Sequence, residues 1–255
     1  MQYSTFAAID IGSYDVILEI FEISKKQGIR SVDKICHRME LGKDTYTLGK
    51  IRPEMEEELC RVLADFVRIM EGYRVDDYRA TASSAISEAS NSLYVLGKIH
   101  QLTGLSVTVL SNSEQRFLSY KALAAMEDNF NKIIEKGTAI LDLDGGSFQI
   151  SLFDKDALVT TQNIRMGSLR IRERLAGIQS ETEHYEEMVE ELIWNEVSSF
   201  KKMYLKDRKI ENIMLIGDVF TDSVYQNIEE KTTKIISREN FNTCLLYTSP
   251  SPRDA

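Results

Sequence analysis

Hydrophobic positions recur along the chain with two different periods. Alternation of apolar and polar residues predicts strands, and apolar residues spaced three and four apart predict helices between them. The expected strands cover 6–10, 16–21, 29–41, 78–82, 105–110, 138–143, 148–153, 158–164 and 212–216. The expected helices cover 53–70, 91–102, 113–129 and 182–203. Strands that alternate with helices predict an α/β fold with a largely central sheet.

The composition narrows the class of protein. The 255 residues include 31 basic and 40 acidic side chains, so the formal net charge is −9. Hydrophobic residues make up 43% and charged residues 28%, which is typical of a soluble globular protein. The net acidity argues against nucleic acid or anionic lipid as a partner, because both favour a basic surface. The length fits one large domain or two domains of ordinary size.

The cysteine and histidine positions argue against a zinc site and against a disulfide framework. Cys36, Cys60 and Cys244 lie far apart, which argues against a disulfide framework and a cysteine zinc site and favours a reducing cytoplasm. The histidines show no His-Glu-x-x-His spacing, so zinc hydrolysis is not expected. No apolar run approaches the roughly 18–20 residues of a membrane span, and no signal peptide is expected at the N-terminus. We therefore expect a cytoplasmic protein without a membrane partner.

The final segment, 244–255 (CLLYTSPSPRDA), follows neither period and contains two of the chain's three prolines. It resembles the translated adaptor read-through that ends many gene models, and the alternative is a genuine disordered tail. We set it aside as a non-native tail. We then expect the natural protein to continue past about residue 243.

An internal repeat is the most informative feature of the sequence. Residues 8–18 (AIDIGSYDVIL) and 140–150 (ILDLDGGSFQI) each contain an apolar strand ending in Asp, a Gly-Ser turn and a second alternating strand. Glycine lets backbone N–H groups approach an anion, and an Asp at the strand end can hold a metal ion that bridges phosphate oxygens. Two such hairpins facing one another would clamp a phosphate chain. A single copy would be ordinary hairpin chemistry.

The two hairpins resemble the phosphate loops of the actin, Hsp70 and sugar-kinase superfamily. Within it, residues 1–240 are similar to the exopolyphosphatase and guanosine pentaphosphate phosphohydrolase (Ppx/GppA) family. The likeness is carried by 6–13 (FAAIDIGS), 82–86 (ASSAI), 110–115 (LSNSEQ), 140–147 (ILDLDGGS) and, more weakly, 166–170 (MGSLR). It implies two ribonuclease-H-like (actin-like) domains with mixed central sheets, an inter-domain cleft and an incomplete second domain. We place the domains at 1–130 and 131–243.

The resemblance also implies an activity and a set of site residues. The activity is Mg²⁺-dependent release of terminal phosphate from polyphosphate or guanosine pentaphosphate, and a homodimer is the assembly that we expect. Glu114 matches the glutamate that orients or deprotonates the attacking water, and Asp10 and Asp142 match metal-side carboxylates. The implied phosphate-binding residues are Gly12, Ser13, Ser84, Gly145, Gly146 and Ser147. The sequence from Ser111 to Glu114 is equally a helix capping box, which is the alternative role for Glu114.

The chain departs from the family pattern beside these loops. Tyr14 and Asp15 replace Asn and Ser, and Ser87 replaces an arginine that grips phosphate. Asp144 replaces a glycine, and Gln149 replaces a second carboxylate. Together these changes weaken anion binding, so a regulatory protein that binds polyphosphate or guanosine tetra- or pentaphosphate is the alternative function. A sugar kinase is disfavoured, because the glycine pair that holds adenosine in that class is missing.

Overall fold

The computed structural model describes residues 3–26, 28–126, 129–176, 184–205, 208–217 and 234–236. The chain packs as two compact units, Met1–Gln115 and Arg116–Ala255. The division therefore falls earlier than the boundary near residue 130 that we placed from the sequence, and it falls inside a helix. The segment 244–255 lies outside the described residues. Within the described ranges, no helix combines the length and the apolar character that a bilayer crossing requires.

The first unit is built on a five-stranded mixed sheet with the order β3-β2-β1-β4-β5. Its strands are β1 (Ser4–Ile11), β2 (Asp15–Ser24), β3 (Gly28–Arg38), β4 (Asp77–Ala82) and β5 (Val107–Val109). The first three are antiparallel neighbours, whereas β4 pairs parallel with β1 and β5 pairs parallel with β4. Its helices are α1 (Leu41–Leu48), α2 (Pro53–Tyr73), α3 (Ser84–Ser87) and α4 (Ser92–Thr103).

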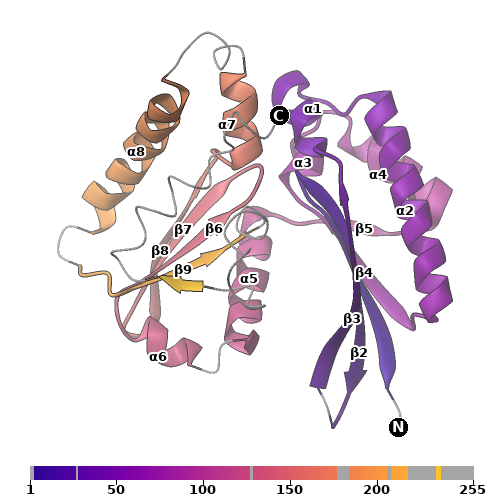
Figure 1. The fold of residues 1–255 in the computed structure, drawn as a ribbon, viewed down its shortest axis with the longest axis horizontal. Coiled ribbons are helices and arrows are strands. Elements are labelled where there is room, and N and C mark those ends of the chain that lie inside the picture. Colours follow the sequence, from indigo (N-terminus) through magenta and orange to yellow (C-terminus); the bar gives the residue numbers. More distant parts are fainter. Residues whose placement is uncertain are drawn as a thin grey trace. The chain divides into compact units, whose positions relative to one another are not determined.

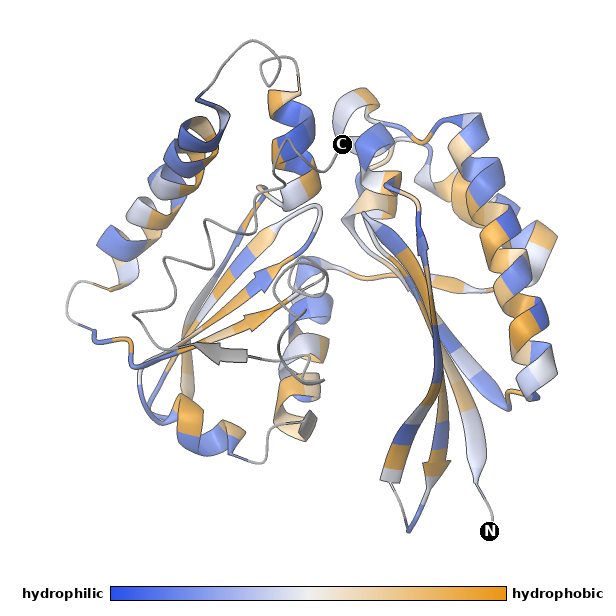
Figure 2. Cartoon of the chain, in the orientation of Figure 1, coloured by the Kyte–Doolittle hydropathy of each residue, from blue (hydrophilic) through white to orange (hydrophobic). Residues whose placement is uncertain are grey.

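The core of the first unit lies between this sheet and the pair α2 and α4, which run side by side along it (Figure 1). Alternate residues of β1 and β2 are buried, so each strand turns one face to the helices. Figure 2 shows hydrophobic and hydrophilic positions alternating in stripes along α2. The helix predicted over 53–70 is confirmed, with Pro53 in its first turn and Leu59, Leu63 and Phe66 in the core.

The second unit contains a second five-stranded sheet with the order β10-β9-β6-β7-β8. Its strands are β6 (Thr138–Leu143), β7 (Phe148–Asp154), β8 (Ala157–Ile164), β9 (Asn212–Ile216) and β10 (Lys234–Ile236). Its helices are α5 (Asn112–Met126), which starts in the first unit, α6 (Phe130–Ile134), α7 (Ser168–Leu175) and α8 (Tyr185–Tyr204). One apolar cluster joins Leu123, Phe130 and Ile134 to the sheet, and another joins Phe200 of α8 to it.

The two sheets share one strand order. Counted within its own unit, each runs third-second-first-fourth-fifth, with an antiparallel opening hairpin and a parallel fourth strand beside the first. One difference is that β10 runs antiparallel to β9, whereas β5 runs parallel to β4. The mixed α/β class with two mixed sheets is confirmed, and the internal repeat in the sequence corresponds to a repeated topology.

Strand β5 is shorter than the predicted strand 105–110, because side chains capture the backbone groups that would extend it. The N–H of Leu105 donates to Thr103 Oγ1 at 3.2 Å, and the N–H of Ser106 donates to Tyr78 Oη at 3.0 Å. Elements α1, α3, α6, α7 and β10 were not predicted from the sequence.

Candidate active site

The turn between β1 and β2 forms the first predicted phosphate loop. The N–H of Gly12 donates to the carbonyl of Asp15 at 2.9 Å, and a Cβ added to Gly12 would meet that same oxygen. This close approach requires glycine. Asp10 lies opposite Ile17 near the end of β1 and is exposed. Its carboxylate accepts a hydrogen bond from Thr81 Oγ1 of the neighbouring β4 at 3.3 Å.

Three hydroxyl groups meet beside this turn. Ser13 Oγ lies 2.6 Å from Tyr46 Oη and 3.3 Å from Ser84 Oγ, and Tyr46 Oη lies 2.8 Å from Ser84 Oγ. We call Ser13, Tyr46 and Ser84 the hydroxyl trio. The two serines that were predicted to bind phosphate are therefore neighbours, because β1 pairs in parallel with β4. Tyr46 was not predicted, and no local sequence signal connects it with the two serines.

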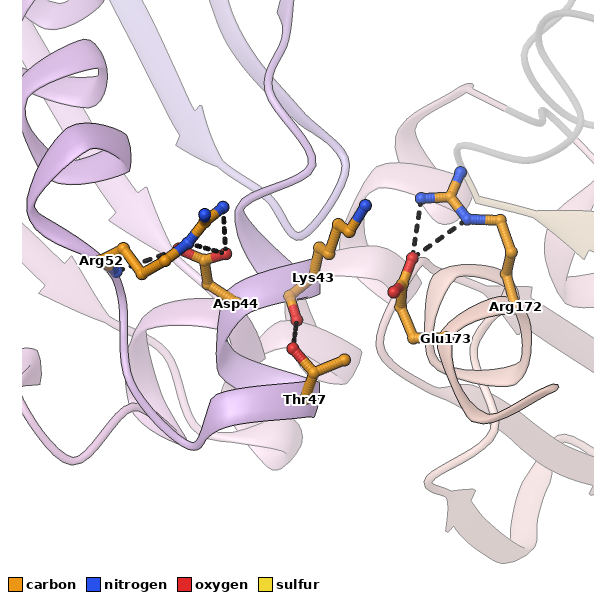
Figure 3. A network of polar contacts seen from close by, with 6 residues as sticks. All are labelled: Lys43, Asp44, Thr47, Arg52, Arg172 and Glu173. Atoms are coloured by element: carbon orange, nitrogen blue, oxygen red, sulfur yellow. Dashed lines mark hydrogen bonds and ion pairs between the residues drawn. The ribbon is translucent and has the colours of Figure 1, made fainter. Parts of the chain in front are cut away.

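Contacts on both sides of Tyr46 fix the backbone of helix α1. Thr45 Oγ1 donates to the carbonyl of Ala85 at 2.7 Å, which ties α1 to α3. The buried carboxylate of Asp44 accepts hydrogen bonds from the backbone N–H of Arg52 at 3.0 Å and from its Nε at 2.9 Å (Figure 3). The N–H of Gly42 donates to the carbonyl of Ser13 at 2.8 Å. The helix is thus attached directly to the first predicted phosphate loop.

Ser83 contributes a further hydroxyl next to Ser84. Its Oγ is buried and has no hydrogen-bond partner within the part of the chain that the structure describes. Buried hydroxyl groups are usually satisfied, so this oxygen marks a place where a bound molecule could donate or accept. Ser87, which replaces the family's phosphate-gripping arginine, is exposed at the end of α3.

The turn between β6 and β7 forms the second predicted phosphate loop. The N–H of Asp144 donates to the carbonyl of Ser147 at 3.0 Å, and this bond closes the turn. The N–H of Gly145 donates to Asp144 Oδ1 at 2.6 Å. Asp144, one of the departures from the family pattern, therefore occupies an N–H group that the resemblance assigns to phosphate. Gly145, Gly146 and Ser147 are all buried.

Helix α7 donates hydrogen bonds to the backbone carbonyls of the second loop. The N–H groups of Leu169 and Arg170 both donate to the carbonyl of Gly145 at 3.1 Å, and Arg170 Nε donates to the carbonyl of Gly146 at 2.9 Å. Farther along α7, Arg172 pairs with Glu173 at 3.1 Å (Figure 3). The first-turn N–H groups of a helix lack partners within the helix. Here the carbonyls of the loop satisfy them, which gives the weak 166–170 motif a structural role.

Asp142 begins a polar row across the second sheet. It lies opposite Gln149 of β7, which lies opposite Asn163 of β8, so the three side chains share one face. Ser119 Oγ of α5 donates to Asp142 Oδ2 at 3.3 Å. Gln149 Oε1 and Asn163 Oδ1 are buried without a hydrogen-bond partner among the described residues. The contribution of Asn163 was not predicted, because cross-strand register decides it. That of Ser119 was not predicted, because it depends on how α5 packs against the sheet.

Glu114 forms the capping box that was its alternative role. Its Oε2 accepts hydrogen bonds from the N–H of Ser111 at 2.9 Å and from Ser111 Oγ at 2.7 Å, and its own N–H donates to Ser111 Oγ at 3.3 Å. These hydrogen bonds, with a smaller contribution from Arg79, hold the pKa of the Glu114 carboxyl below its usual value. The side chain is exposed. A cap and a catalytic carboxylate are compatible roles, and the catalytic one stays a prediction.

The carboxylates present fit Mg²⁺ in chemical kind. Asp10 and Asp142 offer oxygen atoms, each beside a hydroxyl group, and Mg²⁺ is commonly bound by one or two carboxylates together with substrate phosphates and water. Across the described ranges, no group of three acidic, histidine or cysteine side chains could form an all-protein cage. That Asp10, Asp142 and Glu114 face a common cleft stays a prediction, since they belong to two separately described units.

Comparison with known proteins places this arrangement in a family. The Ppx/GppA phosphatase family matches residues 19–253. Among curated proteins, the bifunctional 3-dehydroquinate synthase/phosphatase of Fusobacterium nucleatum is 22% identical over 88% of this chain and 34% of its own length. Exopolyphosphatase 1 of Mycobacterium leprae is 25% identical over 56% of this chain and 41% of its own length. The chain thus spans between a third and a half of the length of these relatives.

Solved structures agree on the fold. An exopolyphosphatase from Cytophaga hutchinsonii superposes with a TM-score of 0.70 at 20% identity, covering 85% of this chain and 68% of that one. The Ppx/GppA family member from Aquifex aeolicus gives a TM-score of 0.65 at 23% identity, covering 86% of this chain and 68% of that one. From the family match over most of its length, we conclude that the chain belongs to the Ppx/GppA phosphatase family.

Proposed function

We propose that this protein is a cytoplasmic phosphoanhydride hydrolase of the exopolyphosphatase type, which releases terminal phosphate from polyphosphate or guanosine pentaphosphate. The observation that supports this most is the pair of matched hairpins, each with an aspartate near the end of its first strand and a glycine-serine turn. Membership of the Ppx/GppA phosphatase family supports the same reaction class. Cys36 and Cys60 are thiols that are not joined in a disulfide, which fits a reducing compartment.

In this proposal the two turns hold the phosphate chain and Glu114 prepares the nucleophile. Glu114 accepts a proton from a water molecule whose oxygen forms a bond to the terminal phosphorus. The bond from that phosphorus to its bridging oxygen breaks, and the shortened chain leaves with the electron pair. Mg²⁺ bound beside Asp10 or Asp142 would neutralise charge on the phosphate oxygens.

The capping box has two opposite effects on Glu114 as a base. Hydrogen bonds from Ser111 lower the pKa of the carboxyl, so Glu114 is ionised at neutral pH and able to accept a proton. The same hydrogen bonds make it a weaker base than an unrestrained glutamate. Positioning of the water is therefore the larger share of its proposed role.

The test measures phosphate release from polyphosphate and from guanosine pentaphosphate by the purified chain, with Mg²⁺ and with excess EDTA. Glu114→Gln keeps the shape of the side chain but removes the basic oxygen, and it should lower the rate by about 10²–10⁴-fold. Glu57→Gln, on the exposed side of α2, is the matched control and should leave the rate unchanged. Equal turnover by wild type and Glu114→Gln would contradict the assignment of Glu114.

One observation favours a second function, that of a regulatory protein which binds these anions without turning them over. In each loop a group that should face phosphate is engaged inside the protein, Ser13 by Tyr46 and the N–H of Gly145 by Asp144. The release assay, combined with a measurement of polyphosphate binding, separates the two functions. Saturable binding of polyphosphate with no phosphate release by wild type would favour the regulatory function.

A further inference from the structure

The hydroxyl trio places a tyrosine where an anion would be expected. Tyr46 Oη lies between Ser13 Oγ and Ser84 Oγ, at 2.6 Å and 2.8 Å. These are distances at which a phosphate oxygen would accept hydrogen bonds from the same two serines. The phenolic oxygen therefore stands in the position of a ligand oxygen, although it belongs to the protein.

The number of hydroxyl protons limits the hydrogen bonds that the trio can donate to a bound anion. The trio has three hydroxyl protons and three mutual contacts, and a proton directed to one of these contacts is not available to a bound anion. Phosphate oxygens without protons can only accept hydrogen bonds. An anion at the first loop therefore gains a hydroxyl donor from the trio only when one of the internal contacts is given up.

Burial leads to the same conclusion. Ser13 has 0% of its surface exposed, so a phosphate oxygen cannot reach its hydroxyl while the surrounding side chains keep their positions. Tyr46 and Ser84 are partly exposed. The backbone of α1 is fixed next to the loop by Asp44 and Thr45, so movement of Tyr46 is a side-chain rotation and does not require the helix to leave.

We infer that Tyr46 limits anion affinity at the first phosphate loop, because its hydroxyl and a phosphate oxygen compete for Ser13 and Ser84. This inference rests on the proposed function, since it takes the Gly12-Ser13 turn as a phosphate site. In the resting protein Tyr46 closes the loop, and a phosphate group must displace it. The apparent affinity for the anion is the affinity of the open loop multiplied by the fraction of molecules in which Tyr46 is already displaced.

Titration calorimetry with methylenediphosphonate in the presence of Mg²⁺ tests this inference, because the P–C–P bridge of the probe resists hydrolysis. Tyr46→Ala should bind the probe about tenfold more tightly than wild type, which corresponds to ~1.4 kcal/mol. Tyr46→Leu keeps apolar packing without the hydroxyl and should show a gain in the same direction, even if the alanine variant fails to fold. Tyr94→Ala removes an exposed tyrosine of α4 and should bind as wild type does.

A double variant identifies the serine donor. Adding Ser84→Ala to the variant at Tyr46 should reduce the gain, because one of the two released hydroxyl groups is then absent. Unchanged or weaker binding in both variants at Tyr46, including no binding at all, overturns the inference. Hydrolysis by wild type without a gain in the variants would remove this inference and leave the proposed function intact. If the Tyr46 variants gain binding but the wild type hydrolyses neither substrate, the inference stands and the proposed hydrolase function is contradicted.

Discussion

Gly167 offers a direct test of how the second predicted phosphate loop is held. It precedes α7 with φ −71° and ψ 163°, a conformation that alanine adopts freely. A Cβ at this position would overlap the carbonyl of Asp144 and the backbone of Gly145. Gly167→Ala should therefore act through steric overlap alone and push the loop away from α7.

The expected loss of stability follows from three contributions. Forcing a methyl group into packed backbone costs roughly 1–3 kcal/mol. The bonds from the N–H groups of Ser168 and Leu169 to the loop carbonyls, at 3.2 Å and 3.1 Å, would lengthen at a cost of about 1 kcal/mol. The lower entropy of alanine in the unfolded chain offsets about 0.5–1 kcal/mol of this. The net expectation is a loss of about 2 kcal/mol from the second unit.

Urea unfolding followed by the fluorescence of Trp194 is the assay. Trp194 is the single tryptophan of the chain and lies in α8, so its signal reports on the second unit. Gly97→Ala is the matched control, because Gly97 is inside α4 and a Cβ there would meet nothing within 4 Å. That control should stabilise the first unit by about 0.5–1 kcal/mol and leave the Trp194 transition unchanged. An unchanged Trp194 transition in Gly167→Ala would refute the steric account of the loop.

Two further predictions concern single side chains. The folded-state pKa of Glu114 is lowered, so the stability it contributes should be present above its ordinary value of 4.5 and lost as the pH falls below that value. Ser111→Ala should reduce this pH-dependent part of the thermal stability measured between neutral and acidic pH, because it removes the hydrogen bond from Ser111 Oγ and leaves the one from the backbone N–H. An unchanged pH dependence would show that the Ser111 hydroxyl contributes nothing. Burial raises the pKa of the Cys60 thiol, whereas Cys36 is exposed. Timed alkylation with peptide mapping should therefore find Cys36 modified well before Cys60, and equal rates would contradict the burial of Cys60.

Much of the fold follows from hydrophobic periodicity. The predicted strands 138–143 and 212–216 coincide with β6 and β9, and the predicted helix beginning at Pro53 is α2. Helix α1 escapes this method because its buried residues include Asp44 and Thr45, which are polar. Their burial depends on Arg52, which lies beyond the end of the helix, and on Ala85, which is 40 residues away, and periodicity carries no information on such partners.

The candidate site was predictable to a smaller extent. Ser13 and Ser84 were singled out through the family resemblance, and parallel pairing of β1 with β4 brings them together. The effect of Asp144 on the N–H of Gly145 is local, so a short-range hydrogen bond could have suggested it. The position of Tyr46 depends on how α1 packs against the loop, and that is a tertiary property.

The shared strand order of the two units also creates a hazard during folding. β1 and β6 are similar in sequence and occupy equivalent central positions, so each could enter the other unit's sheet before either unit is complete. Strands β2 and β7, which pair with β1 and β6, differ in their burial and so favour the correct pairing. Six consecutive residues of β7 are buried, from Phe148 to Phe153, whereas β2 alternates between buried and partly exposed positions. A swapped pairing would separate Phe153 from its apolar cluster and Ser151 from its hydroxyl partners Tyr120 and Thr161, and this penalty favours correct assembly of the two units.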